Sequence, residues 1–201
     1  MQILHPFTGS VQSYAAAQLA ATSDQHRPAH CPQCQAKHPL KAHGFYWRTI
    51  IDVAAAFDGL IRIRRYLCEA CRRTVSLLPH FALPYLRSTI AVIALFLVAR
   101  LLHTKTLKAS LPPPAPYQRG QFWLRRFHWQ AESLCVSLAA ITKPTPAPNF
   151  IHRALHMLQT SGWIPAHRFL FSHLRQHLLG WPPSLSPAGQ RLTLDPIASS
   201  G

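Results

Sequence analysis

The sequence predicts a small α+β protein, in which a cysteine-bearing β-hairpin is followed by α-helices. Two Cys-x-x-Cys pairs flank stretches whose apolar side chains alternate, which is typical of strands. From residue 88 onward the pattern changes to a strongly apolar run, and apolar residues at 124–141 recur at spacings of three and four; both are typical of helices. The 18 prolines outnumber the 8 glycines, so we expect several short units joined by stiff connectors.

The charge of the chain is strongly positive. Its 201 residues include 21 lysines and arginines but only 6 aspartates and glutamates, which gives a formal net charge of +15. Acidic residues would serve solubility at least as well, so solubility alone does not account for this imbalance. Because such a surface attracts polyanions, we expect a nucleic acid as the partner in preference to a membrane.

The first 29 residues mix small and polar side chains without a sustained period. We expect a loosely ordered leader at 1–29, with at most one or two helical turns from Tyr14. The N-terminus also lacks the basic and apolar regions of a secretory signal. The expected location is therefore the reducing cytoplasm, where paired Cys-x-x-Cys units more often bind metal than form disulfides.

Two strand-like stretches lie between the cysteine pairs, GFYWRTI at 44–50 and LIRIRRYL at 60–67. In the second stretch Ile61 and Ile63 alternate with arginines, as a half-buried strand requires. We expect an antiparallel hairpin with a basic outward face. One cysteine pair precedes its first strand and the other follows its second strand.

The cysteine pairs predict a metal site. Cys31 with Cys34, and Cys68 with Cys71, each place two thiols on one tight turn, so that all four sulfurs can reach one tetrahedral ion. The 33 residues between the pairs exceed the usual spacing, but a hairpin insertion brings the two turns together. We predict one structural Zn²⁺ in a zinc ribbon over residues 30–86. Four cysteine ligands close the coordination shell, so the ion is expected to be architectural and not catalytic.

Alternatives to this ligand set are a redox dithiol or a histidine in place of one cysteine. A dithiol would need a thioredoxin-like context and no second pair. His30, His38 and His43 lie near the first pair and are the histidines that a substitution would involve. Cys135 stands alone and is expected to be a buried apolar residue.

Residues 87–142 are expected to be helical and similar in arrangement to a helix-turn-helix. Ser88 or Thr89 is the predicted N-cap of an apolar run that ends at Arg100 and is too short to cross a bilayer. Three consecutive prolines at 112–114 exclude a helix interior there. The next helix has a predicted apolar stripe of Leu124, Phe127, Ala131, Leu134, Leu138 and Ile141.

The C-terminal third is divided by its composition. Residues 143–149 form a predicted Pro-rich linker, and 150–181 a helical hairpin around the SGWIP sequence. Residues 182–201 are expected to be a tail.

Two basic groups are the candidate nucleic-acid contacts. The first, on the second strand and the second cysteine turn, could grip phosphates; it comprises Arg62, Arg64, Arg65, Arg72 and Arg73. The second opens the long helix, where a recognition helix places its base-reading side chains; it comprises Gln118, Arg119, Gln121, Arg125 and Arg126. A solvated basic face, and the polar side of a core helix, are the structural alternatives.

The order of motifs resembles a known family. CPQC, then HGFYWR, then IRIRRYLCEACRRTVSLLPHFALPY is similar to the zinc-binding N-terminal region of bacterial insertion-sequence transposases and of uncharacterised transposase-like proteins. The cysteines, Thr74, Ser76 and Leu78-Pro79 match the family pattern. The resemblance covers roughly residues 30–130 and implies binding to duplex DNA at or near mobile elements, through the ribbon and a helix-turn-helix.

The chain also departs from that family. Transposases of this kind cut DNA with three carboxylates that hold two divalent ions. The acidic residues here offer no such trio; they are Asp24, Asp52, Asp58, Glu69, Glu132 and Asp195. We therefore expect a zinc-dependent DNA-binding protein, derived from or accessory to a transposase, that is not an enzyme. The alternatives are an adaptor that docks on a transposase or another protein, and a decayed transposase fragment; RNA stays open beside DNA.

Overall fold

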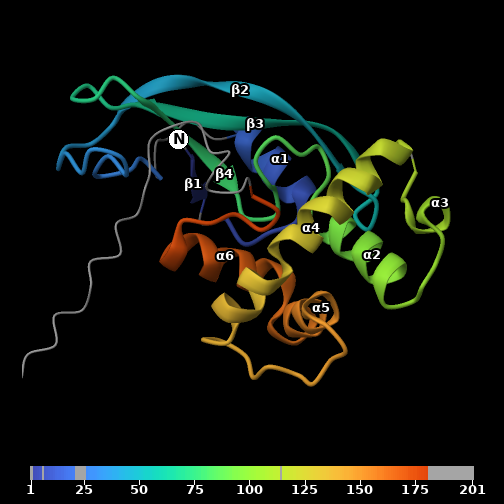
Figure 1. Ribbon diagram of the computed structural model, residues 1–201. Coiled ribbons are helices and arrows are strands. Elements are labelled where there is room, and N and C mark those ends of the chain that lie inside the picture. The colour runs from blue at the N-terminus through green and yellow to red at the C-terminus, as the bar shows by residue number, and fades with distance from the viewer. Residues whose placement is uncertain (1, 6, 21–25, 114, 181–201) are drawn as a thin grey trace, which may run out of the picture.

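The computed structural model describes residues 2–5, 7–20, 26–113 and 115–180, and within these ranges it has four strands and six helices (Figure 1). A small mixed sheet with several helices confirms the predicted α+β class. The predicted tail at 182–201, and the carboxylates Asp24 and Asp195, lie outside the described residues.

The sheet has the strand order β1–β4–β3–β2. β2 (Lys41–Asp52) and β3 (Phe57–Leu67) are antiparallel, which confirms the predicted hairpin. β4 (Thr74–Pro79) returns antiparallel to the end of β3, and β1 (Gln2–His5) lies parallel to β4 at the sheet edge.

The hairpin of β2 and β3 has two different faces. The register pairs Trp47 with Arg62 and Arg48 with Ile61, so alternation assigns every side chain to one face. The inner face carries Tyr46, Arg48, Ile50, Ile61 and Ile63. The outer face carries Phe45, Trp47, Thr49, Leu60, Arg62 and Arg64. In Figure 1 the helices lie below the long hairpin in the view, as do β4 and β1. Along the middle of the hairpin burial concentrates on the inner face, as the 0% exposure of Ile61 and Ile63 shows.

The first residues of the chain are more ordered than predicted. β1 and α1 (Val11–Ala20) occupy about half of the region expected to be a loose leader. Tyr14 is fully buried, and its hydroxyl donates to the Arg62 carbonyl at 3.2 Å, so α1 packs along β3. The partners of both elements lie more than 40 residues away along the chain. Local periodicity in the sequence therefore does not indicate these long-range pairings.

The helices form a second core beside the sheet. α2 (Ile90–Leu101) begins after the predicted N-cap Thr89, whose hydroxyl accepts from the Val92 N–H. α4 (Tyr117–Leu138) buries Phe127, Ala131, Leu134 and Leu138 of the predicted stripe. Ile141 lies beyond the helix and is 40% exposed, because α4 ends three residues earlier than the stripe.

Trp123 is the largest side chain in this second core. It is fully buried, and its ring meets Phe96 of α2 edge-on at 5.2 Å between centroids. α4 approaches α2 closely at Gly120, where a Cβ would lie 3.0 Å from the Phe96 ring. A short helix, α3 (Leu107–Ser110), connects the two.

The last two described helices match the predicted helical pair. α5 (Phe150–Ser161) begins after Asn149, whose side chain accepts from the His152 N–H at 3.0 Å. α6 (Trp163–Leu174) follows Gly162, whose φ of 79° permits the sharp reversal. The predicted linker at 143–149 contains no helix or strand. Within the described residues, no helix is both long and apolar enough to cross a membrane.

Polar contacts fasten the sheet to the helices. The Arg48 guanidinium on the inner face donates to the carbonyls of Leu83 and Leu86, just before α2. The backbone N–H of Thr89 donates to the Ile51 carbonyl at 3.0 Å, which fixes the start of α2 against β2. The sheet and the helical core therefore share a hydrogen-bonded seam.

Candidate metal centre

The two cysteine turns have the same backbone geometry. In the first turn, the Cys31 N–H donates to the Ala36 carbonyl at 3.1 Å and the Gln35 N–H donates to the Cys31 carbonyl at 2.9 Å. Gln35 has a positive φ of 59°. This pattern closes the chain tightly around the pair of thiols.

The second turn repeats this pattern. The Cys68 N–H donates to the Arg73 carbonyl at 3.0 Å, the Arg72 N–H donates to the Cys68 carbonyl at 2.8 Å, and Arg72 has a φ of 58°. Residues in the left-handed region carry a strain of order 1 kcal/mol, which persists only where the surroundings enforce it. Two unrelated sequences thus adopt one turn shape around a cysteine pair.

The hairpin brings the two turns together. The register pairs Lys41 at the start of β2 with Leu67 at the end of β3, so the turns that precede and follow them lie at the same end of the hairpin. A small core supports both turns; its buried members are Cys31, Leu40, Tyr66, Cys68, Val75 and Leu77.

All four sulfur atoms lie within 4.8 Å of one another. The Sγ atoms of Cys31 and Cys71 are 3.7 Å apart, and those of Cys34 and Cys68 are 3.6 Å apart. Tetrahedral coordination with metal–sulfur bonds of about 2.3 Å places the sulfurs about 3.8 Å apart, which agrees with both distances. Both exceed the ~2.05 Å of a disulfide bond, and all four thiols are free. The cluster could therefore hold one metal ion.

The cluster is partly shielded from solvent. Cys31 and Cys68 are fully buried, whereas Cys71 is half-buried and Cys34 is exposed. The His38 Nε2 lies 3.9 Å from the Cys68 sulfur, and no histidine belongs to the four-residue group. His38 thus lies beside the cluster, while His30 and His43 are exposed.

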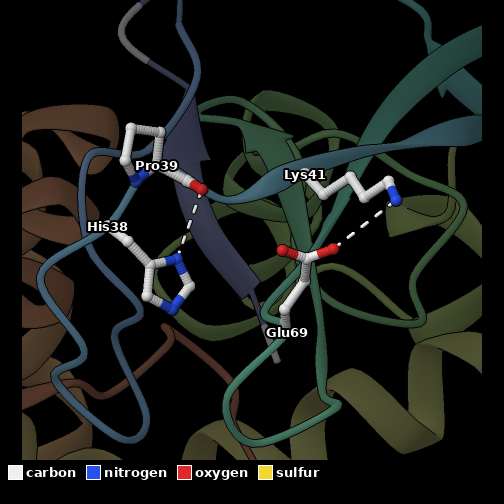
Figure 2. A network of polar contacts seen from close by, with 4 residues as sticks. All are labelled: His38, Pro39, Lys41 and Glu69. Atoms are coloured by element: carbon white, nitrogen blue, oxygen red, sulfur yellow. Dashed lines mark hydrogen bonds and ion pairs between the residues drawn. The ribbon is translucent and has the colours of Figure 1, made fainter.

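Polar contacts around the cluster hold its two sides in place (Figure 2). The Nδ1–H of His38 donates to the Pro39 carbonyl at 3.3 Å. Glu69, inside the second turn, pairs with Lys41 at 3.5 Å. Both partners of this ion pair are more than half exposed, so its contribution to stability is small. It nevertheless links the second turn to the start of β2.

Ionisation of the thiols depends on neighbouring backbone dipoles and sulfurs. Burial raises the pKa of Cys31, but the backbone N–H groups of Cys34 and Gln33 outweigh it and bring that pKa down to about 7. The Arg73 N–H lowers the pKa of Cys71, yet desolvation and the adjacent sulfurs raise it to about 12. Several thiolates crowded together are unfavourable without a cation, which is the electrostatic condition for metal binding.

Within the described residues, the carboxylates form no group of potential metal ligands. The cysteines are the one group of three or more potential metal ligands found there. Asp52 instead accepts from the backbone N–H groups of Ala54 and Ala55, at 3.1 and 3.2 Å, and so shapes the hairpin turn. Glu69 is engaged with Lys41.

Comparison with known proteins gave one match. Residues 31–110 are similar to a family described as a domain of unknown function, DUF6431. Searches of curated proteins and of solved structures found no match. The matched segment begins at Cys31 and ends with α3, so it contains both cysteine turns, the hairpin, β4 and α2. None of these findings connects the chain with transposases, and that resemblance stays a prediction.

The arginines predicted on the ribbon are divided between two surfaces. Arg72 and Arg73 are exposed on the second cysteine turn. Arg62 and Arg64 are half-buried on the outer face, whereas Arg65 belongs to the inner face, with its guanidinium 5.9 Å from the Tyr46 ring centre. Arg65 is as half-buried as Arg62 and Arg64, whereas Arg72 and Arg73 are exposed.

The residues predicted at the start of α4 are also divided. Gln118, Gln121 and Arg125 are exposed and Arg119 is half-buried. Arg126 is buried and donates to the Leu179 carbonyl at 2.7 Å. This burial departs from the predicted surface contact because Arg126 lies three residues after Trp123 and four before Gln130, on the buried side of the helix.

Sequence reasoning missed a groove beside the start of α4. It is an open depression of about 350 Å³ lined by Tyr85, Leu86, Arg87, Pro116, Gln118, Arg119 and Phe122. Tyr85 is 83% exposed and has a positive φ of 63°, which is unusual for an aromatic residue. A loop residue of this kind has no periodic signal in the sequence. Arg87, two residues later, is a basic residue that could have been counted among the candidate contacts.

Proposed function

We propose that this chain is a zinc-dependent DNA-binding protein, accessory to or derived from a transposase, that carries no catalytic domain. The observation that supports it most is the sulfur cluster, whose separations of 3.6 and 3.7 Å fit one tetrahedral ion. Four thiolates in a closed shell favour Zn²⁺ or an iron–sulfur centre over hard cations. A tetrahedral site with four sulfur ligands has no open coordination position, which suits a structural Zn²⁺.

The ion would act as a clamp between two segments of chain. Cys31 and Cys34 precede the hairpin, and Cys68 and Cys71 follow it, so one ion fixes both ends relative to each other. Structural zinc in small modules contributes on the order of 10 kcal/mol of folding free energy. The ion would thereby set the position of the exposed Arg72 and Arg73.

Duplex DNA is the proposed ligand because charge and exposed donors coincide at α4. Gln118, Gln121 and Arg125 are exposed in the first turns of the helix, and the groove beside them contains Arg87 and Arg119. Gln and Arg side chains can donate to base edges in the major groove, and arginines contact phosphates. The net charge of +15 supports binding that depends on counterion release.

The decisive experiment measures duplex DNA binding as a function of salt, before and after removal of the metal. We expect the logarithm of the association constant to fall linearly with the logarithm of salt concentration, and binding to be lost on chelation. Arg125→Ala should weaken binding and reduce the slope of this salt dependence by about 1, which corresponds to the loss of one phosphate contact. Lys143→Ala, which removes an exposed charge from the 143–149 segment, is the matched control. Undetectable or salt-insensitive binding contradicts the proposal.

An adaptor function is the second candidate, and exposed apolar side chains on α4 favour it. Trp129 is 56% exposed and Val136 is 74% exposed, and exposed apolar side chains can form a protein-binding surface. A stable complex with a partner protein, formed by a chain that binds no DNA, would replace the DNA-binding proposal with this one.

A further inference from the structure

The outer face of the β2–β3 hairpin exposes aromatic rings. Phe45 is 42% exposed and Trp47 is 49% exposed, and their centroids are 6.0 Å apart with the ring planes at 83°. Leu60, on the same face of the neighbouring strand, is 57% exposed. Three large apolar side chains are thus presented together on one side of a sheet.

Packing within the described residues does not account for these rings. The apolar residues of the inner face join Val11, Tyr14 and Phe81 in a buried cluster, whereas Phe45 and Trp47 belong to no cluster of the core. Exposed aromatic rings grouped on one face are typical of a binding surface.

Arginines stand beside these rings. The strand register places Arg62 opposite Trp47 and Arg64 opposite Phe45. The Arg62 guanidinium lies 4.5 Å from the Phe45 ring centre and also donates to the Gln18 carbonyl in α1, so it is held in position over the ring.

Negative charge is sparse on this surface. Among the described residues, Asp58 is the one carboxylate that the register assigns to the outer face, and it lies at the turn end of the hairpin. The opposite end carries the exposed Arg72 and Arg73 of the second cysteine turn. A polyanion that contacts the rings would therefore meet positive charge toward the cysteine cluster.

The combination of rings and arginines selects among possible ligands. In a duplex the bases are stacked on each other, so their faces are unavailable to side chains on a sheet. In a single strand each base has a free face that can stack on an aromatic ring, and the phosphates remain accessible to arginine. A protein partner would use the apolar rings but would need acidic groups to match the arginines.

We infer that the outer face binds single-stranded nucleic acid, with bases stacked on Phe45 and Trp47 and the backbone held by Arg62 and Arg64. This inference rests on the proposed function only in taking nucleic acid as the ligand, because it uses a surface other than α4. A chain with both surfaces would hold a duplex at α4 and an unpaired strand at the hairpin.

The test measures binding of the full-length, metal-loaded chain to a fluorescent single-stranded DNA oligonucleotide, to RNA of the same sequence, and to the corresponding duplex. Trp47→Ala and Phe45→Ala should each weaken single-strand binding by about 5- to 100-fold and leave duplex binding unchanged. The ratio of DNA to RNA affinity identifies which polymer the face prefers.

The matched control is Trp129→Ala, which removes a tryptophan of similar exposure from α4. It should leave single-strand binding unchanged. Trp47→Phe should retain binding and Trp47→Leu should lose it, because stacking needs an aromatic ring and apolar contact does not. The Leu variant also keeps the test decisive should Trp47→Ala be insoluble.

Two outcomes would overturn the inference. One is single-strand binding that Trp47→Ala and Trp47→Leu leave intact; the other is an equal loss in Trp129→Ala. Failure of the proposed function is separate, because it appears as duplex binding that is absent or insensitive to Arg125→Ala. Single-strand binding that depends on Trp47 would stand even in that case.

Discussion

Single residues in the cysteine turns have two roles that substitution can separate. Gln35 and Arg72 occupy equivalent positions in their turns with φ of 59° and 58°, so backbone shape at this point is independent of side-chain identity. Arg72 therefore contributes a charge at a position that the turn itself fixes. The cysteines, in contrast, contribute through their side chains, because the separations of their sulfur atoms fit a single coordination shell.

We predict that purified wild-type protein contains one zinc per chain and that Cys34→Ser loses it. Cys34 is exposed, so the substitution removes a ligand without leaving a cavity. Cys135→Ser is the control, because the Cys135 thiol lies on α4 and donates to the Phe150 carbonyl at 3.4 Å, away from the cluster. Elemental analysis of both variants gives the result, and zinc retained by Cys34→Ser would contradict the ligand set.

At the scale of elements, α4 shows how one helix divides adjacent residues between structure and surface. Arg125 is exposed, while Arg126 points into the core, contacts the Phe122 ring at 4.9 Å and donates to the Leu179 carbonyl. Burial, followed by the charge of Arg125, lowers the pKa of Arg126 from its usual value. The same helix thus holds the segment near Leu179 on one side and is open to ligands on the other.

We predict opposite effects for these neighbouring arginines. Arg126→Ala should lower the free energy of unfolding by about 1–3 kcal/mol, because it leaves a buried carbonyl without its donor. Arg125→Ala should change stability by less than about 0.5 kcal/mol, as expected for an exposed side chain. Denaturant titration measures both. Equal stability of the two variants would mean that the Leu179 contact does not hold the structure together.

Elements with local signals were predictable, and elements whose partners are distant were not. The hairpin follows from alternation within each strand, and α2 from Thr89 before an apolar run, both of which are properties of neighbouring residues. The cluster of four cysteines follows from the cysteine spacing. β1 depends on pairing with β4, and Tyr85 depends on a loop shape, so neither has a periodic signature. The burial of Arg126 was predictable, because it lies on the same side of the helix as Trp123.

At the scale of the whole molecule, a chain of histidines joins the sheet to the C-terminal helices. The Nδ1 of His167 in α6 lies 3.2 Å from the His80 carbonyl after β4, so this nitrogen must donate. The Nε2 of neutral His167 then accepts from the Nδ1–H of His177 at 3.0 Å. Burial, followed in the case of His177 by the charge of His167, lowers the pKa of His167 to about 4 and that of His177 to about 3.

We predict that the protein loses stability as the pH falls from about 6.5 to about 4. In this range an unfolded histidine, with a pKa near 6.5, binds a proton that buried His167 does not, so acid favours the unfolded state. One such histidine changes the free energy of unfolding by about 1.4 kcal/mol per pH unit, and by about 3 kcal/mol across the window.

The contribution of His167 can be separated from acid release of the metal. His167→Gln should flatten the dependence of unfolding free energy on pH between 6.5 and 4, whereas His173→Gln, at an exposed position on the same helix, should not. Denaturant titrations at several pH values, with zinc content measured at each, provide the comparison. Parallel pH profiles for wild type and His167→Gln would exclude His167 as the cause.

The parallel pairing of β1 with β4 has a consequence for synthesis of the protein. Gln2 leaves the ribosome roughly 70 residues before its partner Ser76, an interval of roughly 4 to 14 seconds at ordinary translation rates. Cys31 and Cys34 also emerge well before Cys68 and Cys71. The nascent chain consequently carries an unpaired edge strand and an open pair of thiols through this interval. Pairing of β1 and completion of the cysteine cluster therefore both wait for the same short segment of chain, residues 68–79.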